Sequence, residues 1–74
     1  MSNVIHLHTT QPAKANGVFA QINIAARRMG YSPDLAFRAA MAAKRRYLAG
    51  GVSPARVISD QRAQLRLSAE QVPA

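Results

Sequence analysis

The segment Val18–Tyr47, VFAQINIAARRMGYSPDLAFRAAMAAKRRY, decides the fold of this 74-residue chain. Apolar residues recur at spacings of three and four on both sides of a short turn, which is the pattern of two amphipathic helices. The turn, Gly30-Tyr31-Ser32, contains a glycine suited to end one helix and a serine suited to begin the next. Six of the ten Lys and Arg residues lie in this segment. We therefore expect two helices at a sharp angle that present one basic surface.

The first predicted helix covers residues 18–29, and Gly30 is the residue past its end. Arg27 and Arg28 close its last turn, where positive charge suits the helix dipole. Its apolar stripe is predicted to face the core and consists of Val18, Phe19, Ile22, Ala25, Ala26 and Met29.

The second predicted helix covers residues 33–49 and has the clearest start signal in the chain. Ser32 can cap it, Pro33 suits the first helical position, and Gly50-Gly51 stops it. At about 100° per residue, two faces separate. The predicted core face contains Phe37, Met41 and Leu48, with Ala36, Ala40, Ala43 and Tyr47 beside them as a surface for a partner helix. The opposite face is basic and contains Arg38, Arg45 and Arg46, interleaved with Leu35, Ala39 and Ala42.

A third helix is predicted over residues 54–68, because Ser53-Pro54 repeats the capping device. Its apolar stripe is thin and comprises Val57, Ile58, Leu65 and Ala69, while Arg56, Arg62 and Arg66 extend the positive surface. We expect a small helical domain over residues 18–69 and a frayed tail over residues 70–74.

Residues 1–17 are predicted to form an N-terminal strand or flexible arm, followed by a linker. In this segment Ile5 and Leu7 alternate with His6 and His8, which is the period of a strand. A lone strand has no partner in the chain, so it would pair between molecules or remain a mobile arm. The expected fold is therefore all-α, three short helices, with an N-terminal β-strand that could pair across a dimer.

The composition indicates a small core and an anionic partner. Hydrophobic residues make up 49% of the chain, but 15 of them are alanine, which buries little area. A core this small favours a homodimer, and with no cysteine in the chain it has no disulfide support. The net charge of +7 suggests an anionic ligand. No apolar run approaches the roughly 18 residues of a membrane span, so we expect no membrane partner and a cytoplasmic location.

The residues for catalysis are scarce, so we expect no enzyme and no catalytic site. The acidic residues are Asp34, Asp60 and Glu70, and no pair of them is predicted to share a site. His6 and His8 form an H-x-H, which alone is a poor metal site. No glycine-rich phosphate loop occurs. We expect neither a cofactor nor a metal.

The pattern resembles the ribbon-helix-helix family of small dimeric DNA-binding proteins. The resemblance rests on the apolar series of the first helix, Gly30 and Ser32 in the turn, and then Phe37, Ala40 and Met41. It implies that strands from two subunits enter the major groove as a ribbon. Residues 4–9 would form that ribbon, with His6 and His8 toward the bases and Ile5 and Leu7 toward the helices.

The chain also resembles the helix-turn-helix of AraC-type activators. Ala26, Gly30, Tyr31 and Phe37 match recurring positions of that family, and Gly51-Val52-Ser53-Pro54 is similar to its ending. This resemblance implies that Asp34, Leu35, Arg38 and Ala42 face base edges. Both resemblances imply DNA binding, but they assign it to different elements.

We therefore expect a small DNA-binding regulator of phage or plasmid type, acting as a homodimer. The residues expected at nucleic acid are Arg27, Arg28, Ser32, Arg38, Arg45, Arg46, His6 and His8. Those expected at the dimer or partner interface are Ile5, Leu7, Ala36, Ala40, Ala43 and Tyr47. The alternative is a small helical protein-interaction module that inhibits or adapts a host protein, with the alanine face as its contact surface.

Overall fold

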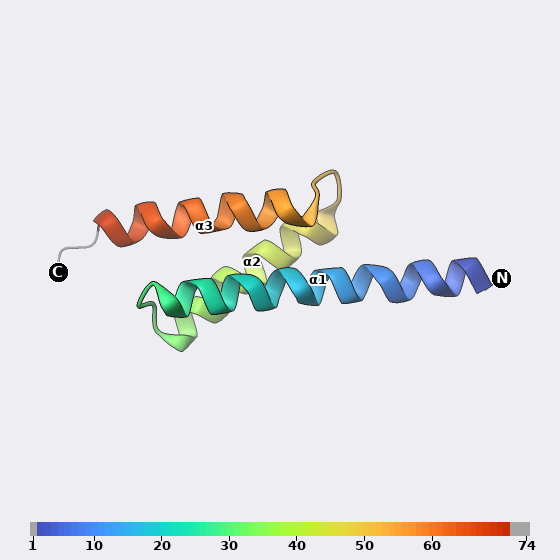
Figure 1. Cartoon of the computed structure of the whole chain (residues 1–74), viewed down its shortest axis with the longest axis horizontal. Helices are drawn as coiled ribbons and strands as arrows, with labels where there is room; N and C mark the ends of the chain where they lie inside the picture. The colour runs from blue at the N-terminus through green and yellow to red at the C-terminus, as the bar shows by residue number, and fades with distance from the viewer. Residues whose placement is uncertain (1, 72–74) are drawn as a thin grey trace.

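A computed structural model describes the backbone of residues 2–71 and the side chains of residues 12–69. It contains three helices, α1 (Ser2–Arg28), α2 (Pro33–Ala49) and α3 (Pro54–Gln71), and no strand within residues 2–71. In Figure 1, α1 and α3 run in the same direction and α2 returns the chain between them. The expected all-α fold of three helices is confirmed.

The N-terminal segment differs from the expectation in the single chain. Residues 4–9, predicted as a strand, belong to α1, and so do the linker residues before Val18. Without a partner strand, a helix pairs backbone N–H and C=O groups locally, although Pro12 inside α1 lacks an N–H to donate. Pairing across a dimer stays a prediction. The side chains of Ile5, His6, Leu7 and His8 lie outside the described residues.

The turn between α1 and α2 is fixed by two hydrogen bonds around Gly30. The Gly30 N–H donates to the Arg27 carbonyl and the Tyr31 N–H donates to the Ala26 carbonyl, both at 3.1 Å. This pair of bonds is the Schellman motif, which requires a left-handed residue. Gly30 has φ of 100°, as the sequence predicted for the residue past the helix end.

Helix α2 begins and ends where its capping residues predict. The Ser32 hydroxyl accepts from the Leu35 N–H at 3.2 Å, and Pro33 occupies the first turn. At the other end the Gly50 N–H donates to the Tyr47 carbonyl at 3.1 Å. Ser53 caps α3 in the same way, but α3 continues to Gln71, beyond the predicted end at residue 68.

The core lies mainly between α1 and α2 and is built largely from alanine. Ile22, Val18 and Val57 are its largest fully buried side chains. The buried residues are Ala15, Val18, Ile22, Ala26, Ala36, Ala40, Ala43, Tyr47, Val57 and Leu65. Because alanine side chains are short, the two helices approach closely while burying little area per residue.

The prediction of which face of α2 packs in the core is wrong, because the neighbouring face of the helix is buried instead. Phe37 and Leu48 are 52% and 53% exposed, whereas Ala36, Ala40 and Ala43 are fully buried. A sequence pattern weights large apolar residues, but close packing against α1 requires the small ones. The larger residues flank the contact, and Phe37 meets the Phe19 ring edge-on with centroids 5.4 Å apart.

The same packing corrects the predicted partner interface. Ala36, Ala40, Ala43 and Tyr47 were expected to face a second protein, but they are buried inside this chain. They lie within the core that α1, α2 and α3 share, so they offer no free surface in the folded protein.

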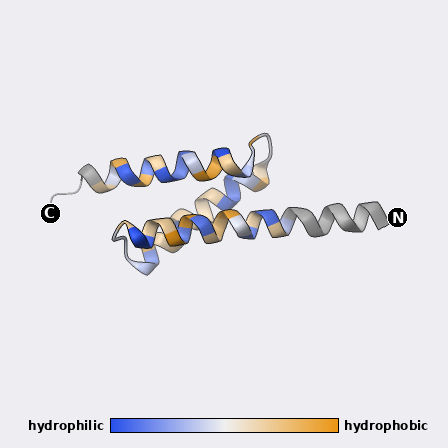
Figure 2. Ribbon diagram, in the orientation of Figure 1, coloured by the Kyte–Doolittle hydropathy of each residue, from blue (hydrophilic) through white to orange (hydrophobic). Residues whose placement is uncertain are grey.

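Helix α3 is attached by a thin apolar contact and two polar ones. Val57 and Leu65 are buried, while hydrophilic and hydrophobic residues alternate along the rest of α3 (Figure 2). The Tyr31 hydroxyl donates to the Leu65 carbonyl at 2.5 Å, which joins the α1–α2 turn to α3. Arg46 of α2 pairs with Asp60 of α3 at 3.0 Å.

Candidate nucleic-acid interface

Two carboxylates account for the ion pairs among the described side chains. Asp34 pairs with Arg38 at 3.7 Å, and both side chains are at least 74% exposed. Asp60 pairs with Arg46 at 3.0 Å and with Arg56 at 3.3 Å. Exposed pairs contribute little to stability, but they do compete with any other anion for these three arginines.

Asp60 is the most constrained charged group of the structure. Its hydrogen bond with Arg46 lowers the pKa of the carboxyl below its ordinary value of 3.8, and Arg56 adds to the effect. Desolvation opposes this shift but does not reverse it. Asp60 therefore stays ionised near neutral pH and ties α2 to α3.

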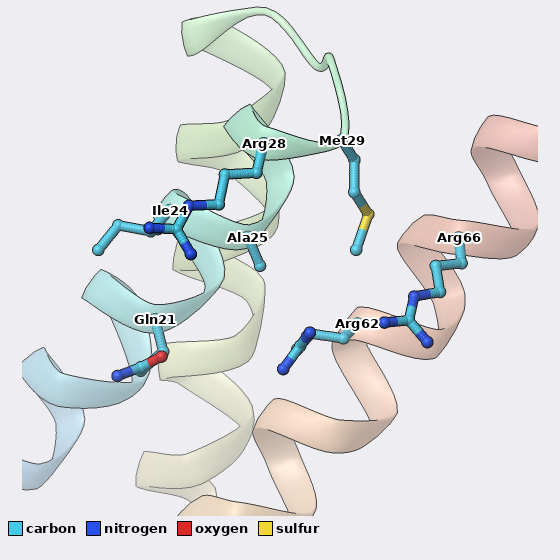
Figure 3. Close-up of a pocket in the computed structure, with 7 residues that line it drawn as sticks. All are labelled: Gln21, Ile24, Ala25, Arg28, Met29, Arg62 and Arg66. Carbon is cyan, nitrogen blue, oxygen red and sulfur yellow. The ribbon is translucent and has the colours of Figure 1, made fainter.

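A cleft of about 220 Å³ lies between α1 and α3 and has three arginines at its edges. Figure 3 shows Ala25 and Met29 pointing from α1 toward α3, while Arg62 points back toward α1. The residues that line the cleft are Gln21, Ile24, Ala25, Arg28, Met29, Arg62 and Arg66. None of these is acidic, so the cleft combines an apolar floor with a positive rim.

The positions of the rim arginines follow from the end of α1 and from the residue spacing on α3. Arg28 is the last residue of α1. Arg62 and Arg66 are four residues apart on α3, so they lie on the same face one turn apart. All three side chains are exposed. A second hollow, of about 260 Å³, adjoins Arg62 and Arg66 on α3.

The structure separates the residues expected at nucleic acid into groups. Arg27, Arg28 and Arg45 are exposed, with no ion pair to a described carboxylate. Arg38 and Arg46 are exposed but already paired. The Ser32 hydroxyl is occupied as the α2 cap.

Arg62 and Arg66 were expected only to extend the positive surface, and they emerge as part of the cleft. The four-residue spacing was visible in the sequence, but the neighbouring position of Arg28 was not, because it depends on how α1 and α3 pack. Each of the three side chains ends in a guanidinium group, a planar cation with several N–H donors. This arrangement can attract and hold an anion.

No protein-family model, curated protein or solved structure matches the chain. Among the described residues, no helix is both long and apolar enough to span a bilayer. The same part of the chain contains no group of three or more His, Asp or Glu residues that could hold a metal ion.

Proposed function

We propose that this chain is a small basic DNA-binding regulator that acts as a homodimer. The observation that carries the proposal is the imbalance of charge on the folded surface. Of the ten basic residues, only Arg38, Arg46 and Arg56 contact a described carboxylate. The remaining basic residues form no ion pair with a described carboxylate. If they neutralise phosphates, counterion release on binding would favour the complex.

The contacts to DNA in this proposal come from side chains of all three helices. Arg27 and Arg28 lie at the end of α1, Arg45 on α2, and Arg62 and Arg66 on α3. These residues would fix the position of the protein on the backbone, since phosphate contacts carry no direct sequence information. Residues 4–9 remain the candidate for base contacts through a ribbon formed by two chains.

The homodimer is supported by the small core and by exposed apolar side chains. Phe37 and Leu48 are about half exposed, and Met41 lies between them on the same flank of α2. A flank of this kind on a soluble monomer is typical of a contact surface. A second copy would cover it and bring two basic surfaces to the same duplex.

Fluorescence anisotropy with a labelled duplex of about 20 base pairs tests the proposal. We expect binding at about 50 mM salt that weakens steeply by about 200 mM, because each neutralised phosphate releases counterions. Affinity that does not change across this range, or no binding at the lower salt, would contradict the proposal. Sedimentation at the same concentrations measures the oligomeric state.

A protein-interaction module is the second candidate, and the exposed flank of α2 favours it. The alanine face no longer supports this candidate, because it is buried in the chain. The double substitution Phe37→Ser and Leu48→Ser discriminates the two functions. If the chain is a DNA-binding regulator, the variant should still bind DNA as a monomer. If the chain is a module that uses this flank, the variant should lose its protein partner, and neither the wild type nor the variant should bind DNA.

A further inference from the structure

We infer that the cleft between α1 and α3 binds the sugar–phosphate backbone of DNA without regard to base sequence. The inference rests on the proposed function and specifies where the backbone lies. It concerns the rim arginines Arg28, Arg62 and Arg66, the last two of which were expected only to extend the positive surface.

Like charges are concentrated at the cleft. Arg28 lines it at the end of α1, and Arg62 and Arg66 line it from α3. Arginines four residues apart on one helix repel each other. No described carboxylate offsets the repulsion between Arg62 and Arg66. Arg46 and Arg56 differ in this respect, because both pair with Asp60. An anion in the cleft would remove the cost.

The N–H donors of the rim arginines have a geometry suited to phosphate. A guanidinium group presents several N–H donors in a plane and binds phosphate oxygens in a bidentate manner. Arg62 and Arg66 are separated by one turn, a rise of roughly 5.4–6 Å, so they can contact successive phosphates of one strand. Arg28 lines the cleft from the α1 side, and in Figure 3 its guanidinium group lies beside Ile24.

The cleft has few of the side chains that recognise bases. Its lining contains no aromatic side chain on which a base could stack. Gln21 is its single amide, and the remaining lining residues between the arginines are Ile24, Ala25 and Met29. These apolar side chains make no hydrogen bond to a base edge. The cleft therefore fits a backbone better than a base.

The test compares two sets of single alanine variants that remove the same charge. The cleft set is Arg28→Ala, Arg62→Ala and Arg66→Ala, and the control set is Arg38→Ala and Arg56→Ala, whose arginines are already paired with carboxylates. Affinity for two duplexes of unrelated sequence is measured at several salt concentrations. Circular dichroism melting confirms that each variant is folded, which is expected because all five side chains are exposed.

We expect each cleft variant to reduce the slope of log affinity against log salt by about 0.9 for both duplexes, the value for one lost phosphate contact. The control variants should leave that slope nearly unchanged. If wild-type protein binds DNA but the two sets behave alike, the inference is overturned and the proposed function survives. If a cleft variant alters affinity for one duplex only, the cleft reads bases and the inference is overturned. If wild-type protein binds neither duplex, the proposed function itself fails.

Discussion

Asp60 illustrates at the scale of a residue how this protein uses its few acids. One carboxylate oxygen lies 3.0 Å from Arg46 of α2 and 3.3 Å from Arg56 of its own helix. The pair with Arg46 crosses between helices, so it constrains the position of α3. The pair with Arg56 lies within α3, and the positive charge of Arg56 helps to keep Asp60 ionised.

The lowered pKa of Asp60 predicts a pH dependence of stability. A carboxyl whose pKa falls on folding stabilises the protein above its ordinary value of 3.8, and this contribution is lost as pH falls through the lower folded value. We therefore expect Asp60→Asn to lower the melting temperature near neutral pH but not well below pH 3.8. Thermal melts over this range test the expectation, and a difference that persists in strong acid would contradict it.

Tyr31 makes the second polar connection to α3. Its hydroxyl donates to the Leu65 carbonyl of α3. Among the described side chains of α3, Val57 and Leu65 are the ones buried in the core. We expect Tyr31→Phe to reduce the free energy of unfolding by about 1 kcal/mol, the typical contribution of one hydrogen bond. Urea denaturation measures this change. A variant as stable as the wild type would show that this hydrogen bond contributes little to holding α3.

At the scale of an element, the alanine stripe of α2 sets the distance between α1 and α2. Ala40 has no exposed area, whereas Ala42 is exposed on the same helix. We expect Ala40→Leu to destabilise the protein by about 1–3 kcal/mol through overpacking. Ala42→Leu, which adds the same side chain to solvent, should change stability by less than about 0.5 kcal/mol. Equal melting temperatures for the two variants would contradict this account of the core.

The ends of α2 could be predicted from the sequence because they depend on local chemistry. Ser32, Pro33 and Gly50 act within one turn of themselves, and each occupies the position expected of it. The buried face was harder to predict, because a periodic pattern cannot tell whether α1 packs against large or small residues. Phe37 was therefore assigned to the core, although it flanks the contact and is 52% exposed.

The start of α1 could not be predicted for a related reason. Alternation over residues 4–9 describes a strand, but a strand requires a partner, and the isolated chain is helical there. A second chain could supply the partner strand that the first chain lacks. The described structure thus defines the state of the monomer backbone and leaves the ribbon as a prediction for the dimer.

At the scale of the whole molecule, six of the ten basic residues fall into two groups. Arg38, Arg46 and Arg56 are paired with carboxylates, while Arg28, Arg62 and Arg66 gather at the cleft. The sequence predicted a basic protein but not this division. Arg28 and Arg62 are far apart in the chain, and only the packing of α1 beside α3 brings them to one site.

The most direct test of the proposed DNA-binding cleft is an NMR chemical-shift titration. A short duplex added to isotope-labelled protein should shift the amide signals of residues 21–29 and 59–66 and the guanidinium signals of Arg28, Arg62 and Arg66. The guanidinium signals of Arg38 and Arg56 should move much less. Shifts confined to residues 37–48, or no shift at low salt, would contradict the claim that the α1–α3 cleft binds the DNA backbone.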